Sequence, residues 1–449
     1  MRADHASYAC GAALGFLGDL AMGDPRRGHP VAAFGRAALA VERLLWRDHR
    51  GSGALYTALC AGGAAAGAVL SGRAVRALGR PAPGGSALGS AVLKPSGRPV
   101  LGHRVLGHRA AETSALGRRS PAAQTMLTAA ATWAVLGGTT LGREARAVGG
   151  ALTAGDLDAA RRRLPHLCGR DPQALDESQI ARAVVESVAE NTSDAVVGAL
   201  VWGAVGGVPG LVGFRAVNTL DAMVGHKSPR YRRFGWASAR LDDLAGWPGA
   251  RLTAALAALA GPDPRGAWRA WRRDGHRHPS PNAGPVEAAF AGALGVRLGG
   301  TLAYGGRVEH RPVLNPGGRP VEAADIERAV RLSRRVGALA LGVSVAARLA
   351  AGTRLAAGVA PRPARTAARP GAAPVPAARA PHGALARWAR SMPLLPAQSR
   401  RAPTRELPSS LRGSSVQPAQ RAKTRSYEAP GAGRSGGPAT VRPTAAGRD

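Results

Sequence analysis

Apolar residues gather in six stretches that are separated by charged or Gly- and Pro-rich sequence. They run from Ala9 to Met22, Ala54 to Ser71, Met126 to Leu141, Val196 to Phe214, Leu252 to Ala260 and Val336 to Ala351. A helix needs about 20 apolar residues to cross a bilayer. The stretches that begin at Ala54, Val196 and Val336 come closest and are predicted membrane spans. Because Ala and Gly add little insertion energy, hydropathy alone leaves buried helices of a soluble protein as the alternative.

Between Gly142 and Val185 the pattern becomes amphipathic and charged. Leu152, Leu157 and Leu164 supply an apolar stripe, and Pro165 interrupts the helical pattern. The segment is predicted to be a water-facing helical hairpin. Large aromatic cores are not expected, because aromatic residues make up only 4% of the chain. Ala and Gly instead suit helices whose backbones approach closely.

The predicted fold is therefore all-α, a polytopic helical membrane protein with amphipathic hairpin insertions. Residues 1–78 hold the N-terminal membrane segments, 79–121 form a low-complexity insertion, and 122–351 form the membrane and catalytic core. The basic tail, 352–449, lacks periodicity and is predicted to be disordered. Asp19 interrupts the first apolar stretch and no small-residue cleavage site follows, so an uncleaved segment is expected.

The net charge is +33, but its distribution argues against nucleic acid as a partner. The tail alone carries seventeen Lys or Arg against three Asp or Glu. The remaining excess is spread over loops beside apolar segments, as the positive-inside rule expects of a membrane protein. Anionic lipid attracts such loops, so the bilayer is the expected partner.

The cysteines and the duplicated histidines predict no metal site. Cys10, Cys60 and Cys168 are widely and irregularly spaced, and we expect them to be ordinary buried residues. His103 and His108 lie five residues apart in low-complexity sequence, which is weak evidence for a ligand pair.

The first motif with candidate chemistry follows the first apolar stretch and reads GDPRRGHPV from Gly23. Its Gly and Pro residues predict a turn that places Asp24, Arg26 and His29 at a surface. Two adjacent arginines beside a histidine can hold a dispersed negative charge. A basic anchoring loop is the alternative interpretation.

The second motif reads ESVAENTSD and precedes a strongly apolar helix. Glu186, Glu190 and Asp194 are spaced four apart, so they share one helical face, with Asn191 beside them. Like charges at that spacing repel unless a cation lies against them, and Mg²⁺ prefers carboxylate oxygens. A solvated acidic face is the alternative.

The third motif follows an apolar segment, where ionisable groups are costly and usually functional. Asn218 and Asp221 share a helix face, and a basic loop leads on to further acidic residues. The chemistry-bearing residues of that continuation are Lys227, Arg240, Asp242, Asp243 and Arg251. The tetrapeptide GHKS from Gly225 lacks the upstream glycine of a phosphate-binding P-loop, so no Walker motif is present.

The fourth motif, HPSPNAG from His278, precedes an apolar Gly-rich helix. Ser280 or Asn282 could cap that helix near Pro285. A helix N-terminus with a nearby amide also favours anions, which leaves an anion-binding role open.

Together these stretches resemble the CobD/CbiB family, the membrane adenosylcobinamide-phosphate synthases of cobalamin biosynthesis. The matching text is GDPRRGHPVAAFGR from Gly23, ESVAENTSDAVVGAL from Glu186, FRAVNTLDAMVGHKSPRYRRFGWASARLDDL from Phe214 and HPSPNAGPVEAAFAGALGVRLGG from His278. The resemblance covers 8–75 and 122–350. Several long motifs in the family's order are far more specific than any one alone.

The resemblance implies a multi-pass protein of the cell membrane that joins aminopropanol, or its phosphate, to the propionate carboxylate of adenosylcobyric acid. It implies Mg²⁺ and ATP as a cosubstrate, and other corrinoid-assembly enzymes as possible neighbours. The expected catalytic carboxylates are Glu186, Glu190, Asp194, Asp221, Asp242 and Asp243, of which Glu190, Asp194 and Asp221 are the expected Mg²⁺ ligands. Expected substrate contacts are Asp24, Arg26, His29, Asn191, Asn218, Lys227, Arg240, Arg251, Ser280 and Asn282.

One departure and two alternatives accompany this hypothesis. The family pattern has an asparagine where this chain has Gly246, which questions the local geometry. An intramembrane prenyltransferase would use two Asp clusters to hold Mg²⁺-diphosphate, but neither cluster here has DDxxD spacing. A transporter or scaffold would line a polar path with the acidic helix face.

Overall fold

The computed structural model describes residues 2–24, 28–78, 121–173, 175–304 and 307–357, all within one compact unit. The helices are α1 (Arg2–Met22), α2 (Pro30–Leu45), α3 (Arg50–Leu78), α4 (Pro121–Val135), α5 (Gly138–Thr153), α6 (Leu157–Arg163), α7 (Glu177–Thr192), α8 (Gly198–Val224), α9 (Trp236–Ala260), α10 (Pro264–Asp274), α11 (Ala283–Leu294) and α12 (Ala323–Ala357). Short turns of helix lie at Leu164–His166, Ser193–Val197 and Gly275–Arg277. The predicted disordered tail and the insertion, with His103 and His108, lie outside the described residues except at their edges.

Among the described residues, three segments are long and apolar enough to cross a membrane: Arg50–Ala77, Glu177–Val224 and Ala323–Thr353. They contain the three spans predicted from the sequence. Only 33% of the apolar window in α3 and 28% of that in α12 is buried, so most of their side chains face outward. Apolar helices with an outward apolar surface are typical of membrane proteins, and the alternative of buried soluble helices is not supported.

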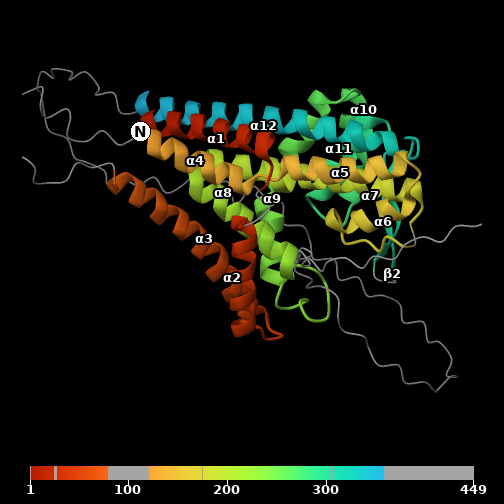
Figure 1. Ribbon diagram of the computed structural model, residues 1–449, viewed down its shortest axis with the longest axis horizontal. Coiled ribbons are helices and arrows are strands. Elements are labelled where there is room, and N and C mark those ends of the chain that lie inside the picture. Colours follow the sequence, from red (N-terminus) through yellow and green to blue (C-terminus); the bar gives the residue numbers. More distant parts are fainter. Residues whose placement is uncertain (1, 25–27, 79–120, 174, 305–306, 358–449) are drawn as a thin grey trace, which may run out of the picture. The chain divides into compact units, whose positions relative to one another are not determined.

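The helices approach one another closely through small residues. Figure 1 shows α1 running beside α4 and α12. A β-carbon on Gly15 of α1 would lie 2.5 Å from the carbonyl oxygen of Ala129 in α4. A β-carbon on Gly249 of α9 would lie 2.8 Å from the Cα of Gly198 at the start of α8. This close backbone approach explains the abundance of Gly and Ala.

Helix α8 doubles back on itself at Gly207, whose φ of 63° and ψ of −146° leave the helical region. A β-carbon on Gly198 would meet the ring of Phe214 at 2.3 Å, and one on Gly210 would meet the Trp202 carbonyl at 2.0 Å. Residues before and after the break therefore run side by side. The second predicted span is a hairpin of two helical arms.

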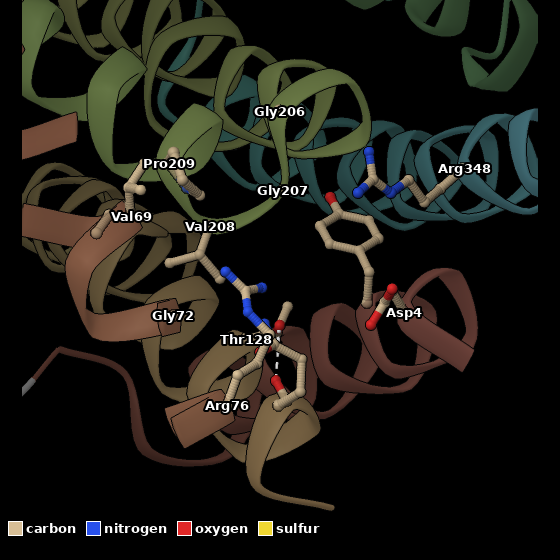
Figure 2. Close-up of a pocket in the computed structure, with 13 residues that line it drawn as sticks. Asp4, Val69, Gly72, Arg76, Thr128, Gly206, Gly207, Val208, Pro209 and Arg348 are labelled. Carbon is tan, nitrogen blue, oxygen red and sulfur yellow. Dashed lines mark hydrogen bonds between the residues drawn. The ribbon is translucent and has the colours of Figure 1, made fainter. Parts of the chain in front are cut away.

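The break in α8 faces a small cavity of about 200 Å³ (Figure 2). Arg348 of α12 donates hydrogen bonds from Nη1 to the carbonyl oxygens of Ala204 and Val205, both at 3.1 Å. The guanidinium lies 5.4 Å from the ring centre of Tyr8, whose hydroxyl is 3.2 Å from Ser344 Oγ. Carbonyls freed by a helix break in a membrane need such internal donors. We therefore assign this cavity a structural role.

The amphipathic segment forms α5, α6 and the first half of α7, but the prediction that it faces water is wrong for α7. Ile180, Val184 and Val185 are fully buried, because α7 packs against α5, α11 and α12. Helix α7 begins at a capping box in which the Asp176 side chain accepts from the Gln179 backbone amide.

A two-stranded antiparallel sheet, not anticipated in the all-α prediction, follows α11. It pairs β1 (Leu298–Tyr304) with β2 (Arg307–Leu314). Gly299 has a φ of 80°, and a β-carbon there would lie 2.2 Å from the Pro312 carbonyl oxygen. Only glycine fits this position, which brings the Gly299 amide to Glu186 of α7.

Candidate active site

A cavity of about 860 Å³ lies where the second, third and fourth sequence motifs meet. Its wall is formed by α7, both ends of the α8 hairpin, the start of α9 and the loop that precedes α11. The predicted residues in the wall are Glu186, Glu190, Asp194, Asp221, Lys227, Arg240, Asp242, Asp243, Ser280 and Asn282. Residues of the second, third and fourth motifs therefore line the same cavity.

The hairpin in α8 explains how carboxylates far apart in sequence become neighbours. Gly207 lies thirteen residues after Asp194 and fourteen before Asp221. The two arms are of nearly equal length, so the chain returns to the level from which it departed. Asp194 interacts electrostatically with Glu190, Asp242 and Asp221, which places these groups along one wall.

A π-helical turn at Ser193–Val197 joins α7 to α8 beside the cavity. Such turns are rare and are frequent at functional sites, because the extra residue re-aims the side chains around it. Asp194 occupies the first turn of this element, and Glu190 lies one turn earlier in α7. Glu190 is exposed toward the cavity and Asp194 is half-buried.

Glu186 differs from the other carboxylates because both of its oxygens are engaged. One oxygen pairs with Arg170, and the other accepts the Gly299 backbone amide at 2.7 Å. The Arg182 Nε atom lies 4.0 Å from the same carboxylate. Glu186 is 3% exposed. The carboxylate therefore ties α7 to the preceding loop and to β1.

Asp221, Asp242 and Asp243 bring negative charge from two helices to the same side of the cavity. Burial, and then the charge of Asp221, raise the pKa of Asp242 to about 7. The Asn218 Nδ2 atom lies 3.5 Å from Asp242 Oδ1, which supports the ionised form. Asp243 forms an ion pair with Arg240 at 3.2 Å. Asp242 therefore exchanges a proton near neutral pH.

Asn282 braces α9 against the loop before α11. Its Nδ2 donates to the Asp243 carbonyl oxygen at 2.9 Å, and its Oδ1 accepts from Arg251 Nη1 at 3.0 Å. A β-carbon on Gly246 would lie 2.7 Å from Asn282 Nδ2. Asn282 therefore fills the space beside Gly246. The Ser280 hydroxyl, rather than Asn282, accepts from the first amide of α11 at 3.1 Å.

His278 and Glu287 form a buried part of the wall that the site prediction did not include. His278 Nε2 lies 3.9 Å from Glu287 Oε1 and 3.5 Å from Arg311 Nη1. Burial and then the charge of Arg311 lower the pKa of His278, whereas burial raises the pKa of Glu287 well above its ordinary value. His278 Nδ1 accepts from the Ser280 amide at 3.0 Å, which favours the neutral imidazole with its proton on Nε2.

Three predicted substrate contacts support the wall instead of lining it. Asn191 donates a hydrogen bond to the Ser187 carbonyl oxygen at 2.9 Å. Asn218 donates to the Asp242 carboxylate, and Arg251 donates to the Asn282 side-chain oxygen. None of the three belongs to the residues that line the cavity, and each has at least one polar atom engaged within the protein. Their contact with substrate stays a prediction.

The first motif lies beside the cavity rather than in its wall. Asp24 is 3.8 Å from His29, and the His29 ring accepts the Val31 amide at the start of α2. Arg215 interacts electrostatically with both Asp24 and Asp194. That arginine links the motif to the acidic wall. Arg26 lies outside the described residues.

The expected Mg²⁺ ligands share the cavity, but they do not form a preassembled metal site. Within the described ranges, no three His, Cys, Asp or Glu side chains are grouped closely enough to hold a metal ion. Mg²⁺ usually keeps several waters and binds one or two carboxylates together with substrate phosphates. The assignment of Glu190, Asp194 and Asp221 as Mg²⁺ ligands stays a prediction.

The cysteines agree only in part with the prediction that all three are buried. Cys60 is buried and Cys168 is half-buried in the cavity wall, whereas Cys10 is exposed. Cys10 lies on the outward face of α1, which explains its exposure in an apolar helix. Burial raises the pKa of Cys168, which favours the neutral thiol over the thiolate.

Sequence reasoning also missed Arg170, Arg215 and Arg311. Arg170 lies in a loop without a recognisable motif, and Arg311 lies on an unanticipated strand. A signal did exist for Glu287, because an ionisable residue inside the apolar helix after HPSPNAG is costly unless it has a role.

Comparison with known proteins confirms the family that the sequence motifs indicate. The family model described as CobD/Cbib protein matches residues 12–333. A cobalamin biosynthesis protein CobD of Mycobacterium tuberculosis is 48% identical over 341 residues, which cover 75% of this chain and 95% of the relative. Proteins of the same name from Geobacter metallireducens and Chromobacterium violaceum are each 39% identical, over 70% and 76% of this chain and 88% and 96% of their own. No solved structure matches. The chain belongs to the CobD/CbiB family.

Proposed function

We propose that this protein acts in cobalamin biosynthesis and joins aminopropanol, or its phosphate, to the propionate carboxylate of adenosylcobyric acid. The product is adenosylcobinamide or its phosphate. The observation that carries the proposal is one cavity of about 860 Å³ lined by acidic and basic side chains from three separate motifs. The relatives are named cobalamin biosynthesis proteins, which supports a role in that pathway.

The chemistry of amide formation accounts for both kinds of charge. A carboxylate and an ammonium do not condense in water, so a carboxylate oxygen first takes a phosphoryl or adenylyl group from ATP, releasing ADP or diphosphate. The amine nitrogen then attacks the carbonyl carbon, and the activated oxygen leaves with phosphate or AMP. The ammonium gives up one proton before this attack and a second as the amide forms.

The acidic wall suits a magnesium nucleotide. Glu190, Asp194 and Asp221 would hold Mg²⁺ through one or two carboxylates, with phosphate oxygens and water completing its shell. Mg²⁺ supplies charge neutralisation of the phosphates during transfer. Lys227 and Arg240, which line the same cavity, would bind the remaining negative charge.

The other carboxylates have different proposed tasks. Asp242 has a pKa of about 7, which suits a group that takes a proton from the ammonium at neutral pH. Glu186 is proposed to position α7, because Arg170 and the Gly299 amide occupy its oxygens. Asp243 is proposed to hold Arg240 in the cavity wall.

The proposed setting is the cell membrane, where other corrinoid-assembly enzymes could supply the acid and receive the product. The three apolar segments and the family support this setting. The family also favours the synthase over the prenyltransferase and the transporter considered from sequence, because the named relatives are cobalamin biosynthesis proteins.

The decisive test is to supply membranes containing the protein with adenosylcobyric acid, aminopropanol phosphate, ATP and Mg²⁺. The proposal predicts a new amide and ATP consumption that requires both organic substrates. Corrinoid movement without ATP consumption would identify a carrier, and turnover of an allylic diphosphate would identify a prenyltransferase. Folded protein that forms no amide from either aminopropanol or its phosphate would contradict the proposal.

A further inference from the structure

Helix α10 has two chemically distinct faces, and one of them packs against the rest of the protein. Ala267, Ala270 and Asp274 are buried, and Trp271 packs against the core from the same face. A β-carbon on Gly292 of α11 would lie 2.3 Å from the carbonyl oxygen of Gly266 in α10. This contact fixes the roll of α10, so its opposite face must point away from the protein. Figure 1 shows α10 on the outer side of α11.

The outward face of α10 is basic and aromatic. Arg265, Trp268, Arg269 and Arg272 follow the spacing of three, four and seven residues that places them on one side of a helix. The three arginines are exposed, and Trp268 is 48% exposed. The Arg272 guanidinium lies 5.6 Å from the centre of the Trp268 ring. A large exposed tryptophan among arginines is costly in water but typical of helices that lie on a bilayer.

The neighbouring helices change from charged to apolar at the level where α10 begins. Arg335 of α12 donates from Nη1 to the carbonyl oxygen of Ala260, the last residue of α9, at 3.4 Å. Beyond this point the outward residues are apolar: Leu259 is 70% exposed, Leu339 39% and Val343 43%. On the other side of Arg335, α12 exposes further arginines. The border between lipid and water therefore passes near Ala260, only a few residues before Pro264.

We propose that the exposed face of α10, together with Arg331, Arg334 and Arg335 of α12, is a docking surface for anionic phospholipid headgroups. Guanidinium groups match phosphate geometry, and an amphipathic indole favours the headgroup layer. Asp263 caps α10, Glu327 pairs with both Arg146 and Arg331, and Asp274 is buried and paired with Arg273. The net charge of the surface therefore remains positive.

Lipid fits this surface better than an acidic protein does, because the exposed apolar residues border it directly. Leu259 and Leu339 are exposed beside α10, and a soluble partner seated on α10 would meet the acyl chains that we expect to cover them. The surface lies outside the catalytic cavity, since none of its residues lines that cavity. The inference is therefore independent of the proposed reaction.

The test uses the full chain in nanodiscs of phosphatidylcholine, with or without phosphatidylglycerol. Emission of Trp268 is isolated by subtracting the spectrum of a Trp268→Phe variant. Lipids brominated near the headgroup or near the chain end report the depth of the ring, and aqueous iodide reports its exposure to water. We expect strong quenching by shallow bromine, weak quenching by deep bromine, and stronger quenching by brominated phosphatidylglycerol than by brominated phosphatidylcholine.

Charge variants test the headgroup contact separately from depth. Arg269→Gln is expected to reduce the preference for phosphatidylglycerol about fivefold, as expected for one basic residue near an anionic surface, and added salt should weaken the wild-type preference. Arg162→Gln, an exposed arginine on α6, should leave it unchanged. Quenching of Trp268 by iodide but not by lipid would overturn the proposal. Protection from both quenchers would indicate a protein partner and would overturn it as well. The proposal would also fail if Arg269→Gln and Arg162→Gln showed the same preference for phosphatidylglycerol.

Discussion

Replacing Gly207 with alanine tests the hairpin that assembles the site. The backbone at Gly207 has a φ of 63° and a ψ of −146°, a region that is essentially restricted to glycine. A β-carbon there would meet only Arg348 Nη2, at 3.7 Å, which is an ordinary contact. The cost of Gly207→Ala is therefore conformational, and we expect a loss of about 1–3 kcal/mol in the free energy of unfolding.

The adjacent Gly206 is a matched control. Its φ is not positive, and a β-carbon there would meet nothing within 4 Å. Alanine favours a helix over glycine by about 1 kcal/mol, so Gly206→Ala should be neutral or stabilising. The two neighbouring substitutions should thus differ by about 2–4 kcal/mol.

Denaturant unfolding in mild detergent measures this difference, with amide formation as the second readout. A relaxed hairpin would move Asp221 away from Asp194, so Gly207→Ala should lose turnover even at temperatures where it remains folded. Gly206→Ala should retain turnover. Equal stability of the two variants would refute the argument that the positive φ at Gly207 shapes the site.

Three further predictions concern single side chains of the cavity. Glu186→Gln removes the carboxylate partner of buried Arg170 and should lower the free energy of unfolding by about 3–5 kcal/mol; a thermal melt close to wild type would contradict it. Asn282→Ala should cost about 1–3 kcal/mol, because two hydrogen bonds are lost, one to the Asp243 carbonyl oxygen and one from Arg251; calorimetry checks this, and stability equal to wild type would contradict it. For Asp242, kcat/KM should rise with pH up to about 7 and then level off, and Asp242→Asn should remove that rise. Folding raises the pKa of Asp242, so this residue should stabilise the fold most below its ordinary pKa of 3.8 and should lose that contribution as the pH rises through about 7. If the melting temperatures of wild type and Asp242→Asn depend on pH in the same way, this prediction is contradicted.

The membrane spans could be predicted from the sequence because long apolar runs have few structural interpretations. The fold of the second span could not. Gly207 and Pro209 stand in a Gly-rich apolar run that is compatible with a kinked but continuous helix. The positive φ at Gly207 goes with the packing of Phe214 against Gly198. This tertiary contact cannot be read from the local sequence.

The acidic part of the site could be predicted because each motif places carboxylates beside an apolar helix, where they are costly. Its basic and buried partners depend on tertiary contacts. Arg170 reaches Glu186 only because the loop after α6 folds over α7, and Arg311 reaches His278 from a strand. A further tertiary contact runs from Asn282 to the Asp243 carbonyl oxygen of α9. Asn282 does not cap α11 with its side chain, and substrate binding by this residue of the cavity wall stays a prediction.

The central claim is that carboxylates from α7 and from the end of α8, on either side of the hairpin, act in one reaction. Single-turnover amide formation by purified Glu190→Gln and Asp221→Asn tests it most directly. Each variant should lose about 100-fold or more in rate while its thermal stability and membrane insertion stay unchanged. Glu177→Gln, which alters an exposed carboxylate in the first turn of α7, should react like wild type. Near-normal turnover of Glu190→Gln or Asp221→Asn would contradict the account.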